Sequence, residues 1–112
     1  MASPILVLST ASSRKEALKI AEILLTKRLA ACVNIVPSII SLYWWKGRRE
    51  KASEVLLLIK SKKSAFKELE KTLRKAHSYE VPEIVALPIT AGSAPYLKWM
   101  LKEIDTRQGA VL

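Results

Sequence analysis

The stretch ACVNIVPSIISLYWWKGRREKASEVLLLI, residues 31–59, determines how the chain folds. The residues from Ala31 to Trp45 are rich in Val, Ile and aromatic side chains, and they predict one long strand that is bent or bulged at Pro37. A turn begins at Lys46-Gly47 and is followed by polar, charged residues. The returning strand is expected from Val55 to Ile59, so the stretch predicts a long β-hairpin.

Two amphipathic helices are predicted, one on each side of this hairpin. Before it, Ser13 and Glu16 have the S-x-x-E spacing of a capping box, and the apolar residues that follow predict a helix from about Arg14 to Arg28. After the hairpin, apolar residues at i, i+3, i+7 and i+10 predict a helix from Ser64 to His77. The apolar positions are Ala17, Ile20, Ala21 and Leu24 in the first helix, and Phe66, Leu69, Leu73 and Ala76 in the second.

Apolar runs at Ile5–Leu8 and Ile84–Leu87 supply two short strands, and a last helix, Pro95–Ile104, has proline in its first turn. The tail after Thr106 is expected to be loose. Strand, helix, strand, strand, helix, strand, joined by right-handed crossovers, makes a four-stranded antiparallel sheet with two helices on one face. The predicted fold is therefore α+β and ferredoxin-like, βαββαβ with an extra C-terminal helix, in a single domain over residues 1–112.

The second face of this sheet needs a cover. A sheet with one face in water alternates apolar and polar residues, but residues 55–59 are apolar at every position, and so are the first and fourth strands. The exposed apolar patch would exceed the area that monomers usually tolerate. The last helix is too short to shield more than part of it. We therefore expect other copies of the chain to cover the rest.

Composition limits the classes of protein to which the chain can belong. One cysteine, Cys32, excludes an internal disulfide and suits a cytoplasmic location, and within an apolar strand it is expected to be a small buried residue. No apolar run approaches the roughly 20 residues of a membrane span, and the N-terminus lacks the pattern of a secretory signal. The abundance of Lys and Glu, with one Asn, one Gln and one Asp, predicts thermostability.

The net charge of +9 favours polyanionic partners. Nucleic acid is nevertheless not expected as a partner. RNA-recognition domains with this strand order stack bases on aromatic residues in the first and third strands. Here those strands, Ile5–Leu8 and Val55–Ile59, contain no aromatic residue.

Four segments of the chain, in order, resemble the CutA family of divalent-cation tolerance proteins. They are KRLAACVNI (residues 27–35), YWWKG (43–47), HSYEVPEI (77–84) and YLKW (96–99). The resemblance implies a ferredoxin-like homotrimer whose architecture is similar to that of the PII signalling proteins. It also implies a part in tolerance to copper and other divalent metals, and it favours a trimer over a dimer.

The resemblance directs the search for a metal site to one histidine. Some CutA members end the first strand with cysteine and carry two adjacent histidines, residues associated with copper binding. Here Ser9 and Ala76 stand at the corresponding positions, and Ser78 replaces a proline. His77, with Glu80, is the candidate metal site, and a divalent metal such as copper is the candidate cofactor. A second interpretation is that His77 favours the carboxyl end of its helix through the macrodipole.

The adjacent residues Trp44 and Trp45 must point to opposite faces of their strand, so one of them should face a partner subunit or a cleft. Aromatic residues could line a ligand pocket with polar anchors, but buried interfaces favour the same residues, and interface packing is the default. The candidate residues are Tyr43, Trp45, Tyr79, Tyr96 and Trp99, with Lys60, Glu80 and Glu83 as polar anchors.

The chain has no nucleophile beside a base, no paired-carboxylate signature and no Gly-rich phosphate loop, so no enzyme activity is expected. The predicted function is that of a CutA-like homotrimer that responds to divalent metal ions by binding. Two alternatives stay open. One is a PII-like sensor that holds a small anionic ligand in inter-subunit clefts, and the other is a stable trimeric scaffold for a protein partner.

Overall fold

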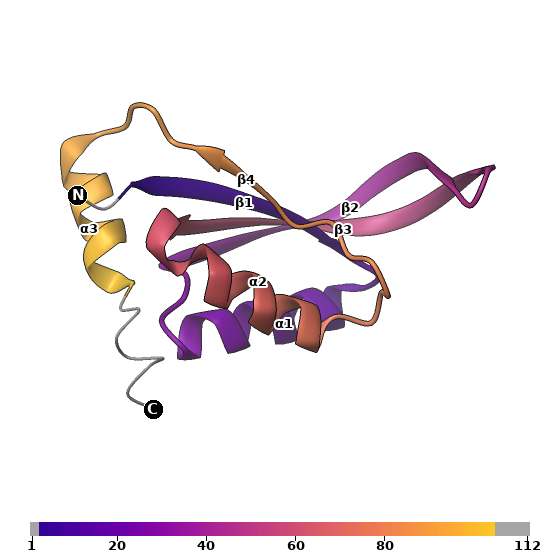
Figure 1. Ribbon diagram of the computed structural model, residues 1–112, viewed down its shortest axis with the longest axis horizontal. Coiled ribbons are helices and arrows are strands. Elements are labelled where there is room, and N and C mark those ends of the chain that lie inside the picture. Colours follow the sequence, from indigo (N-terminus) through magenta and orange to yellow (C-terminus); the bar gives the residue numbers. More distant parts are fainter. Residues whose placement is uncertain (1–2, 105–112) are drawn as a thin grey trace.

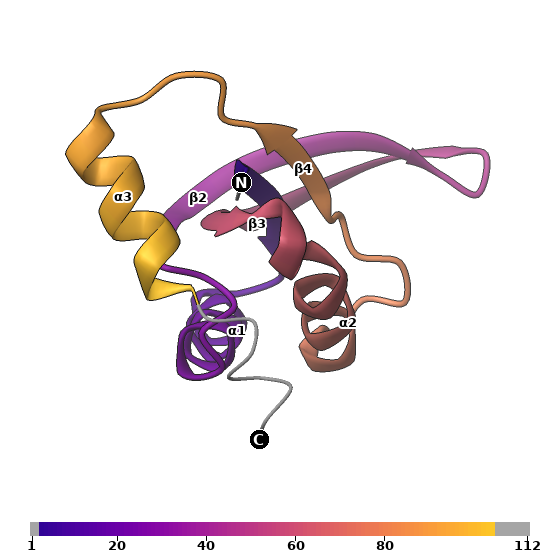
Figure 2. The same cartoon turned by 60° about the vertical axis from the view of Figure 1, so that its left-hand side comes forward.

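The computed structural model describes residues 3–104, and its centre is a four-stranded antiparallel sheet (Figure 1). The strands lie in the order β2-β3-β1-β4. Helices α1 and α2 lie side by side on one face (Figure 2), which confirms the predicted α+β arrangement with an extra C-terminal helix. The elements are β1 (Pro4–Ala11), α1 (Arg14–Thr26), β2 (Cys32–Trp45), β3 (Arg48–Lys62), the 3₁₀ turn η1 (Lys63–Ala65), α2 (Phe66–Ala76), β4 (Val85–Pro88) and α3 (Ala94–Glu103).

The hairpin of β2 and β3 is longer and tighter than predicted. The polar stretch from Arg48 to Ser53 belongs to β3, and the first pair of the ladder is Trp45 with Arg48. Lys46 and Gly47 alone form the turn, with φ of 51° and 77°, the two positive values that a type I′ turn requires. This end of the hairpin projects beyond the helices (Figure 1). Polar residues can extend the strand there because neither face is covered.

Strand β2 is irregular at Pro37, as predicted. Val36 pairs with Leu56 and Ile39 with Glu54, so β2 advances three residues while β3 advances two. Proline has no N–H to donate to the ladder, and the extra residue forms a bulge that accommodates it.

The strand ends also differ from prediction. Strand β1 continues past Leu8 to Ala11, because β3 offers partners as far as the pair of Ala11 with Val55. Strand β4 is shifted by one residue, to Val85–Pro88. Pairing with a neighbouring strand fixes these ends, and the apolar run alone does not reveal that partner.

The helix ends differ by similar amounts. Helix α1 ends at Thr26, and Arg28 beyond it has a φ of 58°, which stops the helix. Helix α2 begins at Phe66, after the 3₁₀ turn η1, and ends one residue before His77. The tail after Thr106 lies outside the described residues.

The core lies between the sheet and the helices, on the apolar stripes that the sequence predicted. The four predicted positions of α1 are all buried. Leu69 and Leu73 of α2 are buried, and Phe66 and Ala76 pack against the same core. Strands β1 and β3 face these helices with alternate residues, and α3 adds Met100 at the end of the sheet. The strand residues of this face are Ile5, Val7, Val55, Leu57 and Ile59.

The other face of the sheet carries no helix in residues 3–104. Helix α3 lies at the end of the sheet near the start of β2 and does not cross this face (Figures 1 and 2). Val85 and Leu87 on β4 are 47% and 45% exposed. The apolar residues of this open face are Leu6, Leu8, Val36, Leu56, Leu58, Val85 and Leu87. The prediction of a sheet that is apolar on both faces is confirmed. Among the described residues, no helix is long and apolar enough to cross a membrane.

Ser9 offers a test of this core. Its side chain is fully buried on the helix-facing side of β1, and its hydroxyl has no hydrogen-bond partner. A buried unpaired hydroxyl is destabilising, so Ser9→Ala should raise the free energy of unfolding by about 1 kcal/mol in guanidinium titrations.

Ser61→Ala is the matched control for this substitution. Ser61 is equally buried, but its hydroxyl donates to the carbonyl of Leu29 at 2.7 Å. Its loss should lower the free energy of unfolding by about 1 kcal/mol. Equal destabilisation by both substitutions would contradict the assignment of Ser9 as unpaired.

Candidate functional site

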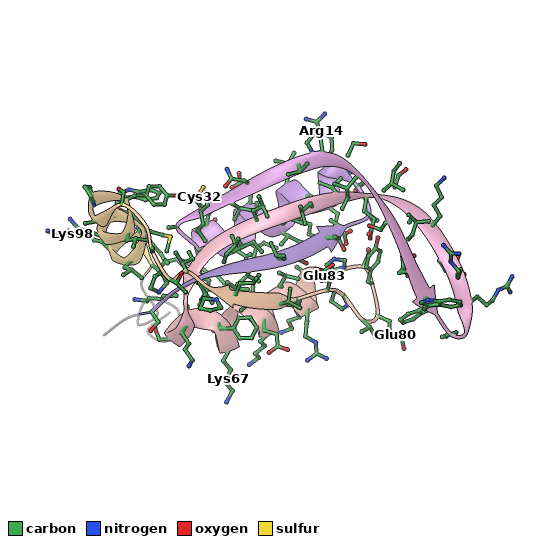
Figure 3. The ribbon with its side chains drawn as sticks, turned by 90° about the horizontal axis from the view of Figure 1, so that it is seen from above. Arg14, Cys32, Lys67, Glu80, Glu83 and Lys98 are labelled. Atoms are coloured by element: carbon green, nitrogen blue, oxygen red, sulfur yellow. The ribbon has the colours of Figure 1, made fainter. Side chains whose placement is uncertain are left out.

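A cleft of about 680 Å³ opens where the hairpin extends past the end of β1. One wall is the hairpin itself, and the other is the loop from His77 to Ile84 that leads from α2 to β4. Figure 3 shows the loop with Glu80 and Glu83 beside the projecting hairpin. The cleft is lined by Thr10, Ile40, Ser41, Leu42, Tyr43, Trp45, Glu54, Tyr79, Glu80, Val81 and Glu83.

Successive side chains of β2 point to opposite faces of the strand, and this decides which of its aromatic residues enter the cleft. Tyr43 and Trp45 are two residues apart, and both line the cleft. Trp44 between them points away and is 71% exposed. The prediction that the adjacent tryptophans face opposite ways is confirmed. Five of the eight predicted pocket residues meet here: Tyr43, Trp45, Tyr79, Glu80 and Glu83.

The other three predicted residues form a separate cluster. Lys60 lies on the open face with its Nζ 5.7 Å from the ring centroid of Tyr96, and the ring of Tyr96 packs against that of Trp99, with centroids 5.5 Å apart and planes tilted by 42°. Lys60 pairs with Cys32 in the ladder. Cys32 is partly exposed on the open face, so the expectation of a buried residue was wrong. One chain thus has an acidic aromatic cleft and, apart from it, a basic aromatic cluster.

Glu54 is a member of the cleft that the sequence did not reveal. It is 9% exposed, and its Oε2 accepts a hydrogen bond of 2.7 Å from the hydroxyl of Tyr79. Burial, together with the hydrogen bond to Glu54 and its charge, raises the pKa of Tyr79 above its ordinary value. The phenol therefore remains a donor at neutral pH. A single charged residue directly before an apolar strand, Val55–Ile59, was the signal available in the sequence.

The cleft loop is fastened to the core at its start. The Nε2 of His77 lies 2.6 Å from the carbonyl oxygen of Thr10, and its Nδ1 accepts the N–H of Tyr79 at 3.0 Å. This geometry fits the tautomer with the proton on Nε2. Glu16 accepts the N–H of Ser78 at 2.7 Å. The loop is thereby tied to the end of β1 and to the first turn of α1.

Glu16 joins these segments through both carboxylate oxygens. The Ser13 hydroxyl accepts the N–H of Glu16, as the capping box predicts, but the carboxylate accepts from the N–H and hydroxyl of Ser12. Burial alone would raise the pKa of Glu16. The hydrogen bonds from Ser12 and Ser78 outweigh burial and lower that pKa to about 2. The carboxylate is therefore ionised across the physiological range.

The two candidate metal residues, His77 and Glu80, differ in their surroundings. The His77 side chain is completely buried, and both ring nitrogens contact the hydrogen-bond partners described above. Glu80 is exposed and lines the cleft. Within residues 3–104, no three His, Cys, Asp or Glu side chains gather in a way that could hold a metal ion. Metal binding at His77 would require the ring to give up one of these hydrogen bonds.

The low pKa of Glu16 makes stability depend on pH. The folded pKa of about 2 lies below the ordinary value of 4.5, so the stabilisation is complete above about pH 4.5 and is lost as pH falls towards 2. Glu16→Gln should lower the free energy of unfolding by about 3 kcal/mol near neutral pH. The difference from the native chain should vanish near pH 2, measured by guanidinium unfolding at one protein concentration.

Glu22→Gln, on the exposed side of α1, is the control for the loss of one negative charge. It should leave the pH profile of the native chain unchanged. A difference between Glu16→Gln and the native chain that persists below pH 2 would contradict the assignment to Glu16 ionisation.

Comparison with known proteins places this geometry in a family. Residues 5–103 match the family model described as CutA1 divalent ion tolerance protein. The chain is 47% identical over 91 residues to "Protein CutA" of Mus musculus, a match that covers 81% of this chain and 51% of that relative. It therefore spans about half the length of this relative, and the same holds for the human one.

Bacterial relatives are matched over nearly their whole length. The "Divalent-cation tolerance protein CutA" of Thermus thermophilus is 48% identical over 94 residues, covering 84% of this chain and 91% of that protein. The solved structure of a divalent cation tolerance protein (Cut A1) from the same species has a TM-score of 0.89 at 44% identity, covering 91% of this chain and 99% of that one. The chain belongs to the CutA1 family of divalent ion tolerance proteins.

Proposed function

We propose that this protein acts in tolerance to divalent metal ions as a homotrimer that binds cations, and that it is not an enzyme. The observation that carries the proposal is the set of three glutamates, Glu54, Glu80 and Glu83, that line one cleft of a chain with a net charge of +9. Carboxylates gathered against the overall charge of a protein favour a cation at that place. The family name points to divalent ions as the cations concerned.

We assign the metal contacts to Glu80 and Glu83 in preference to His77. The glutamates lie at the cleft and are exposed, whereas the imidazole of His77 is buried and hydrogen-bonded on both nitrogens. Copper(II) accepts oxygen as well as nitrogen ligands, and it is our test metal. Two carboxylates hold such an ion weakly. The remaining ligands would come from a neighbouring protomer.

The open face of the sheet supports association into a homotrimer like that of the PII proteins. Its apolar residues are partly exposed on all four strands, and an uncovered patch of this kind marks an interaction site. Three copies with their open faces turned inward would bury these residues in one common core. Because thiols stay reduced in the cytoplasm, the single partly exposed Cys32 suits the cytoplasmic location that we include in the proposal.

A second candidate is a sensor of small anions, and the cluster of Lys60, Tyr96 and Trp99 favours it. The Lys60 ammonium group lies on the open face beside the two rings of α3 at the end of the sheet, where a neighbouring protomer would complete a site. A third candidate, a scaffold for a protein partner, draws on the exposed hairpin tip around Trp44. The acidic cleft itself opposes an anionic ligand.

Light scattering tests the trimer. The native mass should be three times 12.5 kDa at low and at high salt, because apolar contacts are not screened by ions. Leu8→Lys places a charge at the centre of the open face, beside Leu58 and Val85, and should lower the mass towards that of one chain. Leu18→Lys, at an exposed position of α1, should leave it unchanged. A native monomer would contradict the proposed assembly.

Calorimetric titration with Cu²⁺ tests the metal site. The native protein should bind with a defined stoichiometry per trimer, and the double substitution Glu80→Gln with Glu83→Gln should weaken binding by about tenfold or more. Glu22→Gln with Glu68→Gln changes the net charge equally at exposed positions of α1 and α2 and should have no effect. Undiminished uptake in the first double variant would refute the assignment to the cleft, and its loss in a folded His77→Ala variant alone would move the site to the imidazole.

A further inference from the structure

We propose that the acidic cleft binds a small organic cation, an ammonium group on a compact apolar body, with the positive charge beside Glu54 and the rings of Tyr43, Trp45 and Tyr79 around it. The inference rests on the cleft being the cation site proposed above, and it names the class of ligand for which the whole cleft is shaped. Four observations carry it: a buried carboxylate, aromatic walls, the volume of the cleft and a fastened loop.

Glu54 is the first of these observations. It is more than nine-tenths buried, yet within residues 3–104 no Lys or Arg nitrogen lies within ion-pair distance of it. Its Oε2 is used by the Tyr79 hydroxyl, and no protein donor contacts its Oε1 in this part of the chain. This oxygen is not shielded from solvent, since the buried unpaired side-chain atom among the described residues is Oγ of Ser9, so Oε1 is free to contact a ligand in the cleft. A ligand cation in the cleft would supply the missing charge.

The aromatic walls distinguish an organic cation from a bare ion. Tyr43 and Trp45 project from one face of β2, and Tyr79 projects from the facing loop. The face of an aromatic ring attracts a cation, and quaternary ammonium groups are recognised by cages of such rings. The Nζ of Lys46 lies 5.8 Å from the centroid of the Trp45 ring, so a ligand cation would compete with this lysine for the ring. Val81 of the facing loop adds apolar surface for the body of a ligand.

The volume of the cleft and the number of metal-ligating side chains in it both argue against a metal ion as the sole ligand. About 680 Å³ is the size of a small-molecule pocket and far exceeds one coordinated ion. In the described residues no set of three metal-ligating side chains surrounds a common point. The three glutamates also exclude an anionic ligand. A compact organic cation satisfies the charge, the rings and the space together.

The loop that follows α2, opposite β2 in the cleft, is ordered by hydrogen bonds without a ligand. Ser78 and Tyr79 donate their N–H groups to Glu16 and His77, so the backbone that carries the Tyr79 ring is fixed to α1 and to the end of α2. A wall that is already ordered loses little conformational entropy on binding. The loop therefore need not close over the ligand.

Calorimetric titration with choline, and separately with its neutral isostere 3,3-dimethylbutan-1-ol, tests the inference. Choline should bind, and the isostere, which has the same shape without the charge, should bind at least about tenfold more weakly. Glu54→Gln keeps an acceptor for Tyr79 and removes the charge, and it should weaken choline binding by about tenfold or more. Glu68→Gln, the same change at an exposed position of α2, should leave it unaltered.

Trp45→Leu gives an independent readout, because Trp45 lies on the exposed hairpin and outside the core, where its loss should not unfold the chain. It should also weaken choline binding, and the thermal unfolding midpoint of each variant confirms that it is folded. Equal binding of choline and the neutral isostere would overturn the inference, as would no binding of choline at all. Cu²⁺ uptake without choline binding would refute the organic-cation ligand and leave the proposed metal function standing. Choline binding without Cu²⁺ uptake would refute the proposed metal function and leave the organic-cation ligand standing.

Discussion

Both faces of an antiparallel sheet must be shielded from water when both are apolar, and residues 3–104 provide helices for only one of them. Helices α1 and α2 bury Val7, Leu57 and Ile59 from one side, while Leu6, Leu8 and Leu58 on alternate positions of the same strands face outward. Helix α3 packs Met100 against the end of the core and leaves the open face bare. This constraint links the fold to association, since burying the second face requires another surface of similar shape.

The same strands produce the cleft because they are unequal in length. Strand β1 ends at Ala11, but β2 and β3 continue to the turn at Lys46-Gly47. Beyond the end of β1, the hairpin has a free face, and the loop after α2 lies across the gap. A charged residue at this boundary, Glu54, is covered by the loop and bonded to Tyr79. The cleft is thus a consequence of where one strand stops.

Charge is distributed unevenly over this framework. The acidic cleft lies beside the hairpin, whereas Lys60, Tyr96 and Trp99 form a basic aromatic cluster near the start of β2 and α3. Glu16 does not line the cleft. Its ionised carboxylate accepts hydrogen bonds from the N–H groups of Ser12 and Ser78. The ring of His77 likewise forms hydrogen bonds with the backbone of Thr10 and Tyr79. Glu16 and His77 therefore fasten the loop, whereas Glu54, Glu80 and Glu83 line the cleft.

Periodicity in the sequence determined the elements and their order. Apolar spacing fixed the buried stripes of α1 and α2, and Pro37 fixed the bulge of β2, because these features depend on neighbours within a few residues. The ends of β1 and β3 depended on a partner strand far away in the sequence, so the polar residues 48–53 could not be recognised as strand.

The candidate site divides in the same way. The sequence named Tyr43, Trp45, Tyr79, Glu80 and Glu83, but it could not separate them from Lys60, Tyr96 and Trp99, nor could it pair Glu54 with Tyr79. What the sequence determined by itself was which residues lie on which face of each element, because that follows from the local repeat of the backbone. Only the tertiary structure decided which faces meet, because that depends on register and on loop paths that bring distant residues together.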